Sequence, residues 1–207
     1  MIPVKIMALR YIPNASPSLI RSLGVPEGYP SLGILTTDSD DATYIALDEA
    51  TKSADVNVCY ARSFYAGAAN ASTPYAGEVI GILAGPTPGA VRSGIEAALS
   101  ALERIGFEEI QGVPYLAHTV SSCGSYLAAE AGVSQGAALA YLIAPPLESM
   151  FALDAAMKAA DVKLCKLFSP PSETNFGGGL LSGTRSACVA ACDAFATAVA
   201  EVASKPR

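Results

Sequence analysis

The residues best suited to chemistry do not form one known motif. Asp38, Asp40 and Glu49 have the spacing of positions 1, 3 and 12 of a calcium-binding loop. Positions 5 and 6 of such a loop need a ligand and a glycine, but Ala42 and Thr43 stand there. A helix is also expected to begin inside this stretch. The pattern therefore argues against calcium, and no metal site is predicted.

Cysteine spacing offers a second metal-binding pattern. Cys188 and Cys192 lie four residues apart on a predicted helix, but no second pair or histidine motif accompanies them. Buried structural cysteines are the favoured interpretation. The five cysteines form no CxxC pair, which is typical of a reducing compartment.

Enzyme motifs are also missing from the sequence. The glycine-rich runs at 85–89 and 177–179 lack the lysine and the spacing of a phosphate loop. His118, the single histidine, lies five residues from Cys123, and this spacing gives no reason to expect a nucleophile–base pair. We therefore predict no catalytic residues, no cofactor and no enzymatic activity.

The strongest pattern is an internal repeat. The stretch 46–59 recurs as 152–165, with nine of fourteen positions identical. Each copy predicts a helix with alanines four residues apart, then a turn and a strand. Asp48 and Lys52, and likewise Asp154 and Lys158, have the spacing of an ion pair on a helix surface.

Weaker echoes extend the repeat over most of the chain. Gly24 and Gly28 are predicted to match Gly132 and Gly136. We also match the predicted strand 31–36 with 139–144, and Val91 with Val189. These matches predict two domains, 1–106 and 107–207, with a joint at 106–114. Further strands are expected at 4–12, 79–84, 115–120 and 180–182, and a capped helix at 17–23.

Composition limits the class of protein. Hydrophobic residues make up 51% of the chain and charged residues 15%, which indicates large contacts between subunits. The net charge of −6 argues against nucleic acid. No continuous apolar run long enough to span a bilayer is expected, and the chain opens on a strand pattern rather than a signal peptide, so no membrane partner is predicted.

Two segments resemble the bacterial microcompartment shell domain: 142–148 leading into 152–162, and 85–98. Two such domains, each with a strand and helix moved from its end to its front, resemble the circularly permuted tandem shell proteins. The loops 37–44, 62–68 and 170–175 are similar to those of shell proteins from ethanolamine-utilisation compartments. The resemblance implies an α/β fold of the α+β kind, with two small mixed sheets flanked by helices.

The resemblance also implies a role. Such chains form homotrimers that mimic hexamers and pack edge to edge with other shell proteins, enclosing a compartment within the cytoplasm. Lys52 and Lys158 match the lysine at tile edges, which is the favoured interpretation. The alternative is a solvated lysine paired with Asp48 or Asp154. The loops expected to line a gated central pore contain Ser63, Tyr65, Ala66, Gly67, Ala68, Thr174, Asn175, Phe176 and Gly177.

Small metabolites are the implied cargo. An amino alcohol such as ethanolamine needs a carboxylate for its amine and a polar partner for its hydroxyl. The matching positions are Asp40, Glu78 and Thr174, with Phe107 as an apolar wall. Cobalamin is a larger candidate cargo.

Asp40 has an alternative interpretation, because an acidic loop before a helix can also be a plain N-terminal cap. The alternative function is a soluble metabolite-binding or regulatory protein built from the same repeated module.

Overall fold

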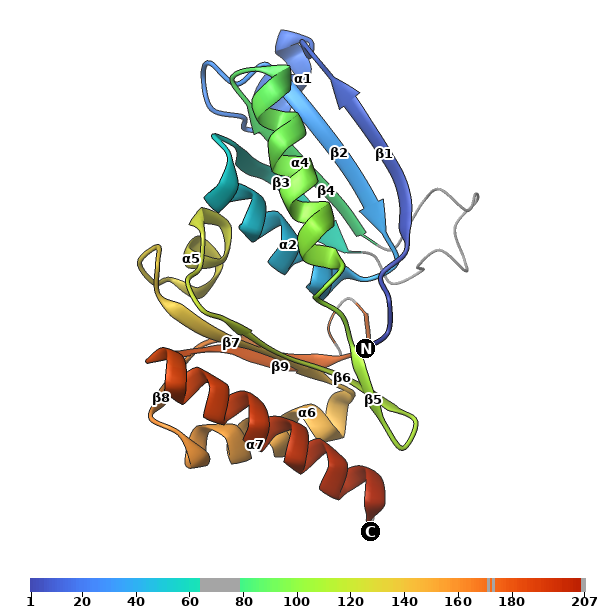
Figure 1. Ribbon diagram of the computed structural model, residues 1–207, viewed down its shortest axis with the longest axis vertical. Coiled ribbons are helices and arrows are strands. Elements are labelled where there is room, and N and C mark those ends of the chain that lie inside the picture. Colours follow the sequence, from blue (N-terminus) through green and yellow to red (C-terminus); the bar gives the residue numbers. More distant parts are fainter. Residues whose placement is uncertain (64–78, 171, 173, 206–207) are drawn as a thin grey trace. The chain divides into compact units, whose positions relative to one another are not determined.

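The computed structural model describes residues 1–63, 79–170, 172 and 174–205. The chain forms two compact units, shown in sequence colours in Figure 1. The first unit contains residues 3–105 together with 124–127. The second contains residues 1–2, 106–123 and 128–207. Each unit has its own sheet and its own pair of long helices.

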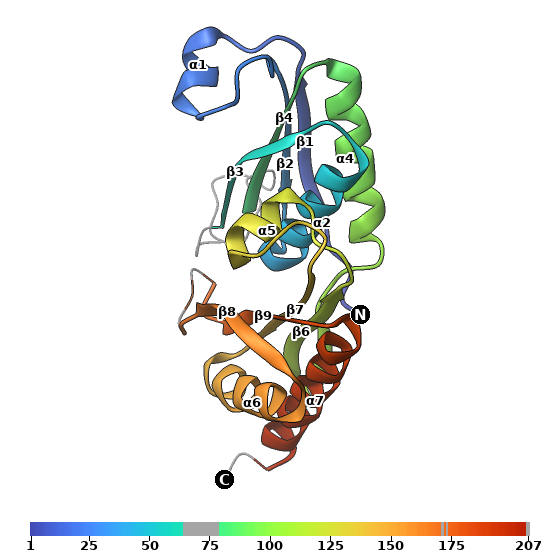
Figure 2. The same ribbon diagram turned by 90° about the vertical axis from the view of Figure 1, so that its left-hand side faces the viewer.

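The first unit is an antiparallel sheet with two helices on one face (Figures 1 and 2). The strand order is β1-β2-β4-β3. In chain order the elements of this unit are β1 (Ile6–Ile12), α1 (Pro17–Ser22), β2 (Ser31–Thr37), α2 (Asp40–Ser53), β3 (Asn57–Ser63), β4 (Val79–Gly85) and α4 (Pro88–Leu102). Helices α2 and α4 lie side by side against the sheet, so their alanine and leucine side chains form the core.

The second unit repeats this arrangement with an added edge strand. Its strand order is β5-β6-β7-β9-β8, and α6 and α7 cover one face. The elements are β5 (Glu108–Ile110), β6 (Val113–Val120), α5 (Ser125–Ala131), β7 (Ala138–Ala144), α6 (Pro146–Ala159), β8 (Val162–Phe168), β9 (Gly177–Gly183) and α7 (Arg185–Ser204). The first three residues of α5 are grouped with the first unit.

The segment 106–114 is more ordered than a simple joint. It holds β5 and the two-residue turn to β6, in which Gln111 and Gly112 both have positive φ. Two such residues form the turn type that matches the twist of a tight antiparallel hairpin. The expected joint is therefore part of the second sheet.

The same order of elements confirms the repeat. The succession β2-α2-β3-β4-α4 returns as β7-α6-β8-β9-α7. Both outer strands also carry a register shift at the same place, around Cys59 in β3 and Cys165 in β8. Both cysteines lie inside their strands and are half-buried, because a bulged residue leaves the regular ladder.

Strand register corrects one predicted match. Ser31 pairs with Gly85, and Ala138 pairs with Gly183. Ser31 therefore corresponds to Ala138 and not to Leu139. A slip of one residue moves every side chain to the other face of the sheet, so the match expected from residue types would have exchanged core and outer positions.

Helix caps correct a second match. Thr87 accepts a hydrogen bond from the Ala90 N–H at 3.1 Å, and Thr184 accepts one from the Ala187 N–H at 3.2 Å. The two threonines are therefore equivalent N-caps. This alignment matches Val91 with buried Cys188, whereas Val189, the match expected from the sequence, is exposed.

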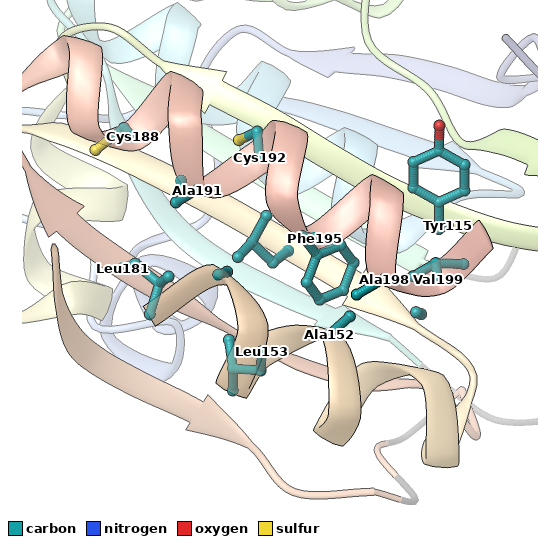
Figure 3. Close-up of a cluster of buried hydrophobic side chains, with 14 of the residues drawn as sticks. Tyr115, Ala152, Leu153, Leu181, Cys188, Ala191, Cys192, Phe195, Ala198 and Val199 are labelled. Atoms are coloured by element: carbon teal, nitrogen blue, oxygen red, sulfur yellow. The ribbon is translucent and has the colours of Figure 1, made fainter. Parts of the chain in front are cut away.

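The cysteines of α7 belong to the core of the second unit. Figure 3 shows Cys188, Ala191, Cys192, Phe195, Ala198 and Val199 along the buried side of this helix, with Phe195 directed toward Ala152 of α6. Cys188 and Cys192 occupy the places of Val91 and Ile95 in α4, which supports their structural role. Burial raises the pKa of Cys192 to about 11, which keeps its thiol protonated.

Helix α7 also departs from an expectation. By length and composition it is apolar enough to cross a membrane, although the sequence was expected to contain no such segment. Its buried residues line the core of the second unit. Packing in this core accounts for the apolar character of that side of the helix.

Gly178 provides a test of close strand packing. It has a φ of 149°, and a Cβ there would overlap the carbonyl oxygen of Leu142 in β7. Gly178→Ala should lower the free energy of unfolding by about 3 kcal/mol or more, because β7 and β9 would have to separate. Urea denaturation measures the change. Gly89→Ala is the control, since a Cβ there meets nothing closer than 3.8 Å. Equal stability of the two variants would show that β7 and β9 can accept a side chain at this position.

Candidate functional site

The first candidate site lies where β2 ends and α2 begins. Asp40 opens α2 and is only 9% exposed. Its Oδ1 accepts a hydrogen bond from the Asp41 N–H at 2.9 Å, and the Ser63 side chain at the end of β3 is a further partner. Burial raises the pKa of Asp40, although these hydrogen bonds partly offset the shift. A buried carboxyl group is therefore placed beside Ser63, the last residue of β3.

A hydroxyl network supports the same corner of the unit. The Thr37 and Thr43 hydroxyl oxygens lie 2.7 Å apart, and the Ser39 N–H donates to Thr37 Oγ1 at 3.2 Å. The Ser39 hydroxyl is buried and has no hydrogen-bond partner among the described residues. Sequence reasoning missed these residues, although a Thr-x-Ser sequence at the end of a strand is a recognisable turn signal.

Asp40 is not the N-cap of its helix. Ser39 occupies the N-cap position and makes no side-chain capping bond. Asp40 and Asp41 both lie in the first turn, where negative charge is favoured by the helix dipole. The cap interpretation therefore explains a preference for acidic residues, but not the burial of both carboxyl groups.

A second group of predicted residues lies in the second unit. The rings of Phe107 and Phe176 are tilted against each other, with centroids 5.6 Å apart. Thr174 donates its N–H to Ser172 Oγ at 3.3 Å, and Asn175 has a φ of 66°. Gly177 begins β9 and is buried. These residues form a tight turn with an aromatic pair beside it.

Each unit thus holds one group of the predicted site residues. Asp40 and Ser63 come together in the first unit, and Phe107 and Phe176 come together in the second. The remaining predicted positions, Tyr65, Ala66, Gly67, Ala68 and Glu78, lie outside the described residues. In the part of the chain that the structure describes, no group of three or more His, Cys, Asp or Glu side chains could hold a metal ion.

The two predicted edge lysines have different surroundings. Lys158 forms the expected ion pair with Asp154 at 2.6 Å, and both side chains are exposed. Lys52 pairs instead with Glu49. The expected partner of Lys52 is Asp48, which is fully buried. Its carboxylate accepts hydrogen bonds from backbone N–H groups instead.

Asp48 binds the backbone at the start of α5. Its Oδ2 accepts from the Gly124 N–H at 2.7 Å, and its Oδ1 accepts from the Leu127 N–H at 2.8 Å. Thr51 adds a third bond, accepting from the Ser125 N–H at 3.0 Å. Burial raises the pKa of Asp48, and the two backbone hydrogen bonds oppose the shift. The helical spacing could not reveal these bonds, because their donors lie more than seventy residues away.

Comparison with known proteins shows which family has this fold. The BMC domain family matches residues 31–120. The chain is 57% identical over 205 residues to the bacterial microcompartment shell protein EutL of Clostridium perfringens, covering 97% of this chain and 94% of that protein. It superposes with a TM-score of 0.95 on the crystal structure of the ethanolamine utilization protein EutL from Leptotrichia buccalis, at 56% identity and with 99% and 96% of the two chains covered.

A more distant structure shares the fold. The crystal structure of PduB, described as a trimeric bacterial microcompartment shell protein, superposes with a TM-score of 0.79 at 21% identity, covering 95% of this chain and 88% of that one. The fold and the repeated module thus define a tandem shell protein of the BMC type.

Within that class, the chain belongs to the EutL family of bacterial microcompartment shell proteins. The predicted resemblance is confirmed, and the protein is a structural component of the shell of a microcompartment of the ethanolamine-utilisation type, inside the cytoplasm.

The family match also supports the permuted order of elements. It runs from β2 to β6, but β6 pairs with β7 in the second sheet. The strand beside β2 in the first sheet is β1, which precedes the matched segment. A strand at the front of the chain therefore completes the first module.

The raised pKa of Asp40 predicts a pH dependence of stability. Between the unfolded pKa of about 3.9 and the higher native value, the native state binds more protons, so the free energy of unfolding falls as pH rises. The Asp40→Asn variant has no ionisable group at this position, so its free energy of unfolding should lack this fall with pH. Its stability relative to the natural protein should therefore increase as pH rises from about 4 through the native pKa.

Urea denaturation across that pH range tests the prediction. Asp193→Asn is the control, because it removes one negative charge from an exposed position of α7. A stability difference for Asp40→Asn that did not vary with pH would show that Asp40 has no raised pKa in the native state.

Proposed function

We propose that three copies of this chain form a pseudohexameric tile with a gated pore that passes small polar metabolites through the shell. One observation carries the proposal: a single chain contains the same sheet-and-helix module twice. Three chains then supply six similar modules, and closed rings are the usual result of such head-to-tail contacts. The domains proposed for these modules are 1–106 and 107–207. The description of PduB as trimeric supports the same assembly.

The proposed pore is lined by the loops that follow β3 and β8. These strands are equivalent in the two modules, so both loops leave equivalent places of their sheets. Ser63 is the last residue of β3, before the first loop, and the turn from Thr174 to Phe176 leads into β9 at Gly177. The aromatic pair of Phe107 and Phe176 packs beside the end of the second loop.

The proposed metabolite site centres on Asp40. A carboxylate beside an unused hydroxyl suits an amino alcohol, because the amine pairs with the acid and the alcohol with the hydroxyl. Asp40 and Ser39 are neighbours in the sequence and carry these two groups, both of them buried. The equivalent of Asp40 in the second module is Pro146, so this chemistry is confined to the first module. Cobalamin remains a proposed larger cargo for an open pore.

The proposed edge role of Lys52 and Lys158 rests on their equivalent positions near the C-terminal ends of α2 and α6. A lysine stem can cover apolar surface while its ammonium group bonds to carbonyl groups of a neighbouring tile.

We further propose that the protein has no catalytic activity, since a shell component acts as a barrier and a passage. Membership of a shell protein family favours this role over a soluble regulator.

Assembly provides the first functional test. Light scattering should give the natural protein the mass of three 21.1 kDa chains, about 63 kDa, or of larger assemblies built from that unit. A clean monomer would contradict the proposed tile.

Lys158→Ala should abolish the extended sheets seen by electron microscopy but leave the trimer intact. The edge contact loses its ammonium group, whereas the trimer loses only an exposed ion pair with Asp154, and such pairs contribute little to stability. Lys163→Ala is the control, because Lys163 is an exposed lysine on β8. Sheets of normal lattice in Lys158→Ala would remove this residue from the tile edge.

Calorimetry with ethanolamine tests the metabolite site. Asp40→Ala should weaken binding at least about tenfold, because a buried ion pair loses its acid. Asp193→Ala, which removes an exposed carboxylate, should bind like the natural protein. Unchanged affinity in Asp40→Ala would exclude Asp40 from the site.

A further inference from the structure

The equivalent helices α2 and α6 differ in how far their surfaces are covered. Ile45 on α2 is fully buried, but its counterpart Phe151 on α6 is 47% exposed. Asp48 is also fully buried, whereas the side chain of its counterpart Asp154 is 59% exposed. Leu147 and Met150 extend the exposed surface of α6. The same helix surface is therefore covered in one module and uncovered in the other.

Residues 124–127 cover α2. Gly124 and Leu127 donate their N–H groups to Asp48. The rings of Tyr126 and Tyr44 have their centroids 6.2 Å apart. Leu127 is only 1% exposed in this position. The covering segment thus contributes both hydrogen bonds and apolar burial.

The first module contains the counterpart of this covering segment at residues 16–19. Two pairs of matching glycines fix the correspondence: Gly24 and Gly132 both have a φ of 64°, and Gly28 and Gly136 have φ values of 85° and 87°. Leu19 therefore corresponds to Leu127. Leu19, however, is 39% exposed, and α1 has no buried residue.

We propose that these two uncovered surfaces meet between two copies of the chain. Leu147, Met150, Phe151 and Asp154 of α6 form the receiving surface, and the segment 16–22 of a second copy covers it. This proposal rests on the trimer proposed above and names the surface that closes it. Each copy has one receiving surface and one covering segment, so the contact is head-to-tail and can close a ring.

The contact between copies differs in chemistry from the contact within the chain. A Cβ at Gly124 would overlap Thr51 Oγ1 and lie 2.6 Å from the Asp48 carbonyl oxygen, so the covering backbone lies directly on α2. In the contact between copies, Ser16 takes the place of Gly124, and Met157 takes the place of Thr51. The Ser16 hydroxyl already accepts a hydrogen bond from the Leu19 N–H at 3.4 Å. Hydrogen bonds to the backbone are thus replaced by apolar contacts. Burial of Leu19 against Phe151 should supply much of the affinity.

Two single substitutions test the two sides of the contact. Phe151→Asp and Leu19→Asp should each reduce the mass measured by light scattering from that of a trimer to that of a 21.1 kDa monomer, at a concentration where the natural protein is trimeric. Both residues are exposed in the single chain, so circular dichroism should show an unchanged fold. Val189→Asp is the matched control, because this residue of α7 is 43% exposed and lies outside the proposed contact.

A double variant tests whether the two side chains meet. Leu19→Lys combined with Phe151→Asp should regain the trimer, because the opposite charges would face each other across the contact. A trimer that persists in either aspartate variant, or a double variant that stays monomeric, would overturn the contact and leave the trimer itself standing. A monomeric natural protein would overturn both proposals.

Discussion

The buried carboxylate of Asp48 is the constraint on which the arrangement of the first unit depends. A carboxylate without solvent is costly unless hydrogen bonds replace the lost water. Gly124 and Leu127 supply those bonds through their backbone N–H groups, and this fixes the residues at the start of α5 against α2. The glycine is needed because a side chain at that point would overlap Thr51. One polar interaction therefore determines which surface of α2 is removed from water.

Duplication explains both the similarity and the differences of the two modules. The caps Thr87 and Thr184 and the shifts at Cys59 and Cys165 are shared, because every copy of the module needs them. The helix starts have diverged. One module begins its helix with two buried acids, and the other begins at Pro146 without them. A ring built from such chains has alternating module types, so polar chemistry and aromatic packing can be assigned to different positions.

Much of the fold could be predicted from the sequence. Apolar periodicity and recurring residues located the repeated helix and strand, and the Ser16-Pro17 cap located the start of α1. The errors were small but instructive. Matching by residue identity paired Val91 with Val189, whereas burial pairs Val91 with Cys188. Identity is a poor guide there because a core position accepts any side chain of suitable size and polarity.

The sequence by itself determined the duplicated module, its local elements and the family resemblance, since these depend on short-range periodicity and on recurring residues. Tertiary structure decided the roles of the acids. Asp48 and Asp154 occupy equal places in the repeat, yet one is buried against a backbone and the other pairs with Lys158 in solvent. Helical spacing describes neighbours three or four residues away. The partner of Asp48 is more than seventy residues distant, so the folded chain alone could reveal it.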